Sequence, residues 1–277
     1  MKGVEMAKGK RIVLAENDRL VREAIGELLQ AKGFEVVPAE DGLEALQSIR
    51  NERPDYVILD IVMPKLDGAR VCWIIRQDPA LRNTPVIAFS SLSAQDFQRF
   101  PELSADAYVA KGTMTASTQR IMEAIEYVDK KGVGDEGFEG GLFGYKGQRP
   151  RQLVGEMLRE KQRETNLFRA LGGNVLELDQ KGRILMASGG ACQLLGKKEP
   201  HLIGESLSSF CLQRDRKVVE DLLVELGKVV EPQEFCAAVQ VGDQQMRLRL
   251  SPIIANNECT EILAIIESMP PENGPSR

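Results

Sequence analysis

The sequence predicts an α/β domain built on a doubly wound parallel sheet of five strands, followed by a smaller α+β domain with an antiparallel sheet. Three observations support this prediction. Short apolar runs rich in Val and Ile alternate with amphipathic stretches over residues 10–130, as in parallel sheets covered by helices. Seven glycines in twenty residues mark a break at 131–150. Over residues 169–268, strand-like runs separated by turn residues replace the earlier alternation.

The composition is that of a globular protein with two domains of ordinary size. Of the 277 residues, 43% are hydrophobic and 28% are charged, which leaves enough apolar material for two cores. The net charge of -5 gives no support to nucleic-acid binding, which needs a basic surface. No run approaches the roughly 20 apolar residues that span a bilayer, and the N-terminus lacks the apolar segment of a secretion signal. We therefore expect a cytoplasmic protein whose five scattered cysteines are reduced: Cys72, Cys192, Cys211, Cys236 and Cys259.

The first helix of the first domain is expected directly after the first strand. Asp18 stands at the position of a helix N-cap, and the amphipathic stretch that follows reaches Gly33, a residue type that commonly ends helices. The same succession of apolar run and amphipathic stretch repeats along the domain, as a doubly wound sheet requires. The expected strands are five apolar runs, at residues 11–15, 34–39, 56–60, 85–89 and 107–110.

Three segments are expected to lie outside the two domains. The glycine-dense stretch 131–150 is predicted to be a linker. Residues 151–168 are charged with a thin apolar stripe, which predicts a linker helix, and residues 269–277 are expected to be a disordered tail. Four large side chains leave open an alternative, in which part of the linker docks on a folded surface: Phe138, Leu142, Phe143 and Tyr145.

The second domain, at residues 169–268, is expected to begin with two strands around an Asp-Gln-Lys-Gly turn, in which Gly182 suits a positive φ. A short helical turn, GACQLLG, and a fuller helix, RKVVEDLLVELGK, follow. Three more strands are expected, joined by turns at Gly242-Asp243 and Asn256-Asn257. This succession predicts an antiparallel sheet with helices inserted between its second and third strands.

Polar side chains stand at the carboxyl ends of the expected strands of the first domain. Glu16 and Asn17 follow the first strand, Asp60 ends the third, Ser90 follows the fourth and Lys111 follows the fifth. The carboxyl ends of parallel strands gather at one edge of the sheet, where ligands bind. Carboxylates, a hydroxyl and an ammonium at one edge suit phosphoryl transfer, with a carboxylate as the nucleophile and a hard cation beside it.

These residues resemble the receiver domain of bacterial two-component response regulators, over about residues 10–130. The most specific part is LDIVMPKLDG, in which an aspartate, Met-Pro and Asp-Gly stand at the family's spacing. The resemblance implies a flavodoxin-like fold, a magnesium ion, and a phosphoryl group that Asp60 accepts from a partner histidine kinase or phosphotransfer protein. It also implies roles for the surrounding residues: Glu16, Asn17, Asp60 and the Val62 carbonyl as cation ligands, Ser90 as the switch hydroxyl, Lys111 as the phosphate-binding lysine and Tyr108 as the rotating aromatic.

The sequence departs from the family pattern in three ways. Asn17 replaces the aspartate that usually ligates the cation, so magnesium binding is expected to be weakened. Gly112 replaces the proline that usually follows the lysine, which puts the customary cis turn in doubt. Val62 and Leu92 are apolar where a polar side chain could orient a water molecule, so we expect slow self-dephosphorylation. A phosphatase with an aspartyl nucleophile usually has a second acid two residues after the first. Val62 occupies that position here, so we do not expect phosphatase activity.

The second domain resembles a PAS domain, over about residues 163–268. The shared features are the two opening strands, Asp-x-x-Gly-Arg-Ile between them, Leu-Leu-Gly at the end of the first helix and Leu-Ile-Gly before Ser-Leu. Ser188 stands where many members have asparagine. The sequence identifies no ligand. Leu207 occupies the place of the reactive cysteine of flavin photoreceptors, so Cys192 is expected to be a core or half-buried residue, and His201 is expected to be an exposed loop residue and not a haem ligand.

The two resemblances together predict a signalling adaptor and not an enzyme: receiver, linker and PAS domain. The PAS domain and linker helix are expected to mediate homodimerisation or partner docking, with neither nucleic acid nor membrane as a partner. Two alternatives stay open. One is a receiver-like scaffold that is never phosphorylated, with Asn17 and Gly112 as signs of decay. The other is a PAS ligand sensor that uses the receiver as its output.

Overall fold

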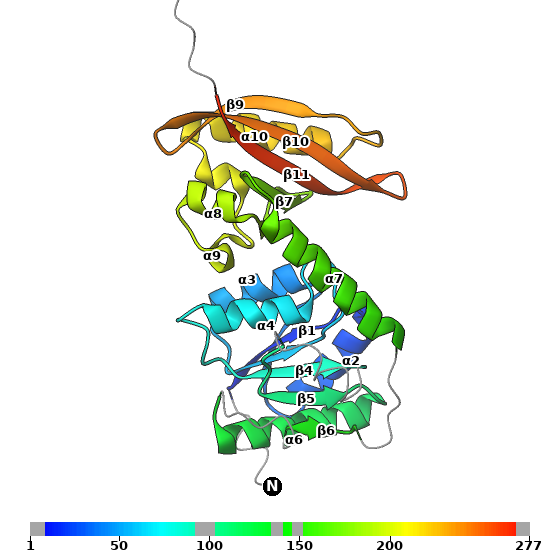
Figure 1. Ribbon diagram of the computed structural model, residues 1–277. Coiled ribbons are helices and arrows are strands. Elements are labelled where there is room, and N and C mark those ends of the chain that lie inside the picture. Colours follow the sequence, from blue (N-terminus) through cyan, green and yellow to red (C-terminus); the bar gives the residue numbers. More distant parts are fainter. Residues whose placement is uncertain (1–8, 92–102, 134–140, 146–151, 270–277) are drawn as a thin grey trace, which may run out of the picture. The chain divides into compact units, whose positions relative to one another are not determined.

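A computed structural model of the chain divides into two compact units, residues 1–159 and 160–277 (Figure 1). Each unit has its own sheet, parallel in the first and antiparallel in the second. The structure describes residues 9–91, 103–133, 141–145 and 152–269.

The sheet of the first unit is parallel and has six strands, one more than the sequence predicts. Their order is β2-β1-β3-β4-β5-β6, so the direction of winding reverses between β1 and β3. The five predicted strands are confirmed: β1 (Arg11–Ala15), β2 (Glu35–Ala39), β3 (Tyr56–Leu59), β4 (Val86–Ser90) and β5 (Ala107–Ala110).

The sixth strand, β6 (Leu142–Phe143), corrects the prediction that residues 131–150 are only a linker. It pairs in parallel with β5, with Leu142 opposite Tyr108. The Phe143 side chain packs against the core and meets the Tyr127 ring edge to face, with ring centroids 5.8 Å apart. Pairing with the open edge of β5 and this aromatic contact stabilise β6. The glycine content of the segment by itself disfavours a strand.

Helices cover both faces of the parallel sheet, α2 and α6 on one face and α3 and α4 on the other (Figure 1). Asp18 caps the first of them as predicted, because its side chain accepts hydrogen bonds from the backbone N–H groups of Leu20 and Val21. Among the described residues, no helix is long and apolar enough to cross a membrane. The helices that the structure describes wholly within this unit are α2 (Arg19–Gln30), α3 (Gly42–Glu52), α4 (Gly68–Gln77) and α6 (Met114–Lys131).

The core of the first unit forms because its central strands are buried on both faces. Every residue of β3, β4 and β5 is buried, as the uninterrupted apolar runs predict. Alternate residues of the strands meet the apolar stripes of α2 and α6 in one cluster, which includes Ile12, Leu14, Ile58, Ile87, Val109, Ile25, Leu29, Ile121 and Ile125.

Two glycines allow the loop after β3 to pass close to its neighbours. A Cβ atom on Gly68 would overlap the backbone oxygen of Asp60, and a Cβ atom on Gly42 would overlap the backbone oxygen of Leu66. Asp67 caps the helix that follows. The Asp-Gly of the sequence motif therefore shapes the loop that holds Asp60 at the end of its strand.

The sheet of the second unit has five antiparallel strands in the order β8-β7-β11-β10-β9, so its first and last strands in the sequence are neighbours. The predicted turns are confirmed: φ is 74° at Gly182, 52° at Asn256 and 61° at Asn257. The strands are β7 (Val175–Asp179), β8 (Ile184–Ala187), β9 (Phe235–Val241), β10 (Gln244–Ala255) and β11 (Glu258–Ser268).

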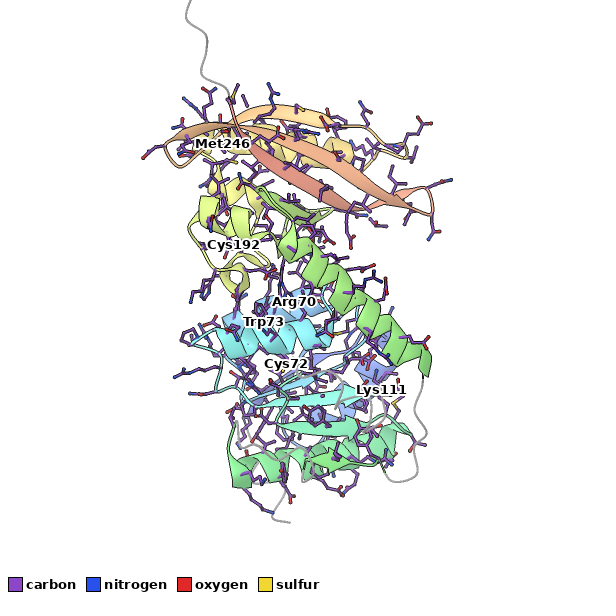
Figure 2. The ribbon with its side chains drawn as sticks, viewed as in Figure 1. Arg70, Cys72, Trp73, Lys111, Cys192 and Met246 are labelled. Atoms are coloured by element: carbon purple, nitrogen blue, oxygen red, sulfur yellow. The ribbon has the colours of Figure 1, made fainter. Side chains whose placement is uncertain are left out.

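Helical segments of the second unit connect β8 to β9, and His201 lies in one of them, not in the predicted loop. His201 is exposed and Leu207 is buried. Cys192, labelled in Figure 2, is half-buried. The predicted linker helix is α7 (Gln152–Ala170). The connecting segments are α8 (Gly189–Leu195), α9 (Glu199–Leu202), the 3₁₀ helix η1 (Leu207–Phe210) and α10 (Gln213–Leu226).

A buried carboxylate fixes the turn between β7 and β8. One oxygen of Asp179 accepts hydrogen bonds from the backbone N–H groups of Lys181 and Arg183, at 3.0 and 2.8 Å. The other oxygen accepts from Nε of Arg183 at 2.7 Å. The Asp-x-x-Gly-Arg pattern is therefore a self-contained turn, in which each polar residue has a partner.

Glu177 and Glu261 form an acidic pair on neighbouring strands, β7 and β11, joined by a hydrogen bond between their side chains. Burial, then the charge of Glu261 and that of Glu164 in α7, raises the pKa of Glu177 to about 8 from its ordinary value of 4.5. The folded unit therefore binds more protons than the unfolded chain between these two values. Its stability falls as the pH rises through that window.

Glu177→Gln is expected to remove the loss of stability that accompanies rising pH, because the amide carries no charge and still bonds to Glu261. We expect the free energy of unfolding to rise by about 1–3 kcal/mol at pH 8 and to change little at pH 5. Calorimetric unfolding of the intact chain at both pH values measures this difference. Glu258→Gln, at an exposed position of β11, the strand of Glu261, is the control. A Glu177→Gln variant that follows the wild type at both pH values would contradict the assignment.

Candidate functional site

Three of the predicted site residues meet at the carboxyl edge of the parallel sheet. The Nζ atom of Lys111, labelled in Figure 2, lies 2.8 Å from Oδ2 of Asp60 and 2.7 Å from Oε2 of Glu16. Asp60 follows β3 and Glu16 follows β1, and these two strands are paired. Lys111 follows β5 and passes over the Phe89 ring, with Nζ 5.2 Å from the ring centroid. One ammonium therefore bridges two carboxylates from neighbouring strands.

Both carboxylates are almost fully buried, with exposed fractions of 1% for Glu16 and 4% for Asp60. Burial raises the pKa of Asp60 although Lys111 opposes the shift. Burial, then the charge of Asp60, raises the pKa of Glu16. Burial alone would lower the pKa of Lys111, but the two carboxylates raise it above its ordinary value. Two buried acids thus share one cation, and the site is short of positive charge.

Asn17 does not join this buried group, because it is exposed on the turn after Glu16. The turn is fixed by its neighbours: the backbone N–H of Asp18 donates to Oε1 of Glu16 at 3.2 Å, and Arg22 donates to the backbone oxygen of Glu16. The structure therefore buries the first residue of the predicted cation pair and leaves the second at the surface.

Ser90 and Val62 also lie at this edge. Ser90 is the last residue of β4, is fully buried, and pairs with Ala110, the residue before Lys111. The backbone N–H of Val62 donates to Oδ1 of Asp60 at 3.3 Å. One oxygen of Asp60 therefore accepts from a backbone N–H, and the other contacts the lysine ammonium. Leu92, the other apolar position predicted to slow dephosphorylation, lies outside the described residues.

Tyr108 of β5 occupies an inward position. Its side chain is 6% exposed, and its hydroxyl donates a hydrogen bond of 2.6 Å to the backbone oxygen of Leu103. Burial raises the pKa of the phenol, which keeps the hydroxyl protonated and able to donate.

Two residues of α6 that were not predicted as site residues hold the loop after Lys111. The backbone N–H of Gly112 donates to Oγ of Ser117 at 3.0 Å, a bond that a proline at this position could not make. Arg120 donates to the backbone oxygen of Ala110 at 3.0 Å. The peptide bonds of the described residues are all trans. A signal was present, because Ser117 and Arg120 stand three residues apart and so share one face of a helix.

The residues present fit a weakly held magnesium ion. In the part of the chain that the structure describes, no three His, Cys, Asp or Glu side chains form a metal-binding cluster. Glu16 and Asp60 supply carboxylate oxygens, the ligand type that Mg²⁺ takes. With Lys111 between them, the pair keeps one uncompensated negative charge, which is less than three acids would provide.

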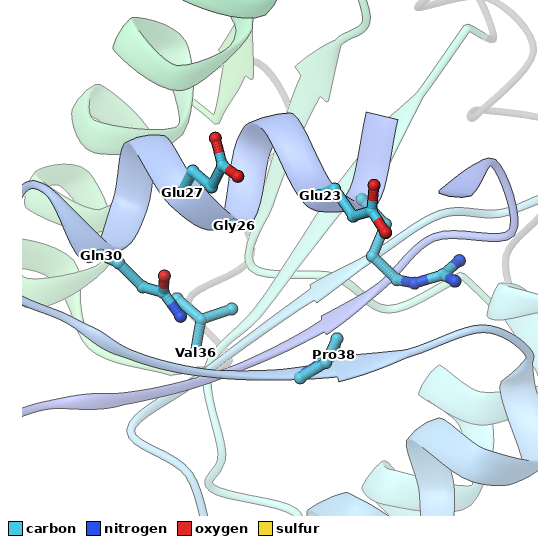
Figure 3. A pocket seen from close by; sticks show the side chains of 7 residues that line it. Glu23, Gly26, Glu27, Gln30, Val36 and Pro38 are labelled. Carbon is cyan, nitrogen blue, oxygen red and sulfur yellow. The ribbon is translucent and has the colours of Figure 1, made fainter. Parts of the chain in front are cut away.

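A groove lies on the same unit, and of the residues around Glu16 it includes Arg22. It is a surface groove of about 340 Å³ between α2 and the edge strand β2 (Figure 3). Its other lining residues are Glu23, Gly26, Glu27 and Gln30 from α2, and Val36 and Pro38 from β2.

The shortage of positive charge predicts opposite effects of two substitutions on stability at pH 7. Asp60→Asn removes one buried carboxylate whose pKa is already raised, so the free energy of unfolding should rise by about 1 kcal/mol. Lys111→Met leaves both carboxylates without their cation and should lower it by about 2–4 kcal/mol. Urea unfolding of the intact chain measures both changes.

Lys65→Met is the matched control for the lysine variant, because Lys65 contacts a single buried carboxylate, that of Asp41. It is expected to lose less stability than Lys111→Met. Equal losses for the two lysine variants, or a destabilised Asp60→Asn, would show that the charges are balanced differently.

The first unit is similar in sequence to known proteins. The family model of the response regulator receiver domain matches residues 12–126. The polar-differentiation response regulator DivK of Brucella anthropi is 31% identical over 118 residues, which are 42% of this chain and 94% of DivK. The gliding motility regulatory protein of Myxococcus xanthus is 38% identical over 109 residues, which are 39% of this chain and 14% of that protein.

Among solved structures, the receiver domain of a Francisella response regulator is 27% identical, with a TM-score of 0.39, and the alignment covers 44% of this chain and 98% of that one. The family match and the coverage of DivK decide the assignment. Through residues 12–126, the chain belongs to the response regulator receiver domain family and so to two-component signal transduction.

Proposed function

We infer that Asp60 accepts a phosphoryl group from a partner histidine kinase or phosphotransfer protein, and that the chain is a signalling adaptor and not an enzyme. The observation that carries this proposal is the bridge from Lys111 to Asp60 and Glu16 at the carboxyl edge of the sheet. A buried carboxylate with an ammonium beside it can form and hold an acyl phosphate, because the ammonium then binds phosphoryl oxygens.

In the transfer, an oxygen of Asp60 attacks the phosphorus of the partner's phosphohistidine. The P–N bond breaks, and its electron pair leaves with the imidazole, which takes up a proton. Lys111 and the Ser90 hydroxyl then bind oxygens of the transferred group. Glu16, Asn17, Asp60 and the Val62 carbonyl would hold Mg²⁺, which when bound shields the charge of the phosphoryl oxygens.

Phosphorylation would change the receiver through Ser90 and Tyr108. The bound phosphoryl group would favour the inward positions of both side chains. We assign the second unit to the PAS type, from its sequence motif and from the antiparallel order β8-β7-β11-β10-β9. It and α7 would form a homodimer or dock a partner protein, in the cytoplasm and without nucleic acid or membrane. Val62 beside Asp60 cannot orient a water molecule, which supports slow self-dephosphorylation.

A receiver-like scaffold that is never phosphorylated is the second candidate. The exposed Asn17 favours it, since the site keeps only two buried carboxylates. A third hypothesis makes the PAS-type unit a ligand sensor with the receiver as its output. Ligand-dependent melting of the purified protein would favour that hypothesis.

Incorporation of a phosphoryl group from acetyl phosphate separates the first two candidates. We expect the intact protein to gain the mass of one phosphoryl group when Mg²⁺ is present and to gain nothing when Asp60→Asn is used. Asp41→Asn is the control, because Asp41 is also buried and its helix-capping role suits an amide. A wild-type protein that gains no mass would favour the scaffold, and an Asp60→Asn variant that still gains mass would contradict the assignment of Asp60 as the acceptor.

Asn17→Asp should restore the missing charge and strengthen magnesium binding by about ten- to a hundredfold, because each tenfold change corresponds to about 1.4 kcal/mol of charge attraction at partial exposure. Isothermal titration of the intact chain with MgCl₂ measures the affinity. Asn51→Asp adds the same charge in α3, at an exposed position, and should leave the affinity unchanged. An unaltered affinity in Asn17→Asp would remove residue 17 from the cation site.

A further inference from the structure

We propose that the segment Gly141–Tyr145, called the strap below, is the output element of the receiver, and that its docking beside β5 and phosphorylation of Asp60 favour each other. The inference rests on the proposed phosphoryl acceptor and adds the surface that senses it. The occupant of the β5 edge is a segment of the chain itself, placed in the sequence between the receiver and α7.

The strap is held to β5 by the backbone and by one aromatic side chain. The backbone N–H of Tyr108 donates to the Gly141 oxygen at 2.7 Å, and β6 continues the pairing. A Cβ atom on Gly141 would lie 3.1 Å from the backbone oxygen of Asp106, which is tight contact. Phe143 packs on Tyr127 of α6. The strap thus covers the β5 edge, which otherwise offers unpaired backbone groups.

Arg120 connects the strap to the loop that carries Lys111. Its guanidinium donates to the backbone oxygen of Ala110, the residue before Lys111. A Cβ atom on Gly112 would lie 3.0 Å from the guanidinium, and a Cβ atom on Gly144 would overlap the Arg120 side chain. Gly144 also has a φ of 82°, which favours glycine. Arg120 therefore lies between the phosphoryl-binding loop and the strap.

A second connection runs through the two tyrosines. Tyr108 is buried in its inward position, and its backbone pairs with Leu142 of the strap. Burial, then the proximity of Tyr108, raises the pKa of Tyr145, while Arg120 opposes the shift. Pairing of the strap with β5 therefore stabilises the inward position that the phosphoryl group is proposed to favour.

These contacts fix the sign of the coupling. When Asp60 carries a phosphoryl group, Lys111 binds its oxygens and fixes the Ala110–Lys111 backbone, to which Arg120 is bonded. The strap then loses less freedom on docking, so it is held more tightly. By linkage, a chain whose strap is displaced must be harder to phosphorylate by the same factor.

Hydrogen exchange of the intact chain, with and without acetyl phosphate and Mg²⁺, tests the first half. We expect the amides of Leu142–Tyr145 to exchange about fivefold or more slowly in the phosphorylated protein. Exchange that stays equal or becomes faster, in protein whose mass confirms phosphorylation, overturns the coupling alone. Absence of any mass gain overturns the acceptor assignment and the coupling together.

Gly144→Ala tests the reciprocal half, and Gly132→Ala is its matched control. Both glycines have a positive φ, 82° and 84°, but a Cβ atom on Gly132 would have no atom within 4 Å. We expect Gly144→Ala to lower the equilibrium extent of phosphorylation about fivefold or more and Gly132→Ala to leave it unchanged. Equal behaviour of the two variants overturns the proposal.

Phe143→Ala provides a second way to displace the strap without touching Arg120, in case Gly144→Ala fails to fold. It removes the contact with Tyr127 and should lower the extent of phosphorylation in the same direction. Thermal unfolding confirms that each variant is folded. A folded Phe143→Ala protein with a freely exchanging strap and wild-type phosphorylation would overturn the coupling.

Discussion

The contact of one lysine ammonium with two buried carboxylates is the interaction on which the first unit depends. Asp60 and Lys111 follow strands that are not neighbours, because β4 lies between β3 and β5. At about 4.8 Å between strands, the two backbones are roughly 10 Å apart, so only a long cationic side chain can cross the end of β4. Lys111 does so over the Phe89 ring. The site therefore needs the parallel order of the strands, and that order needs helices on both faces.

A close backbone approach and a hydrogen bond fix the loops around these buried charges. Gly68 lets the loop after β3 pass against the Asp60 backbone. Gly112, at the position where the family usually has proline, has a backbone N–H that donates a hydrogen bond to Ser117. Asn17, by contrast, is exposed. The site is thus buried at Asp60 and exposed at Asn17. This distribution suits the proposed gain and loss of one phosphoryl group and its cation.

Most of the fold could be predicted from local patterns, since apolar runs, glycine turns and Asp caps act over a few residues. The convergence of Glu16, Asp60 and Lys111 followed from strand order and was predicted too. Strand β6 was missed as a strand because its two residues are stabilised by Phe143 packing on a distant helix, not by their neighbours in sequence. The contact between Glu177 and Glu261 was not predicted for the same reason, because strand pairing brings together residues that are far apart in sequence.

The most direct test of the account is the position of the phosphoryl group. Borohydride reduces an aspartyl phosphate to homoserine, so trapping the phosphorylated chain and sequencing its peptides by mass spectrometry identifies the acceptor. The account predicts homoserine at residue 60 and an unmodified Glu16, although both carboxylates contact Lys111. A reduced residue at position 16, 18 or 67 in place of 60 would contradict it.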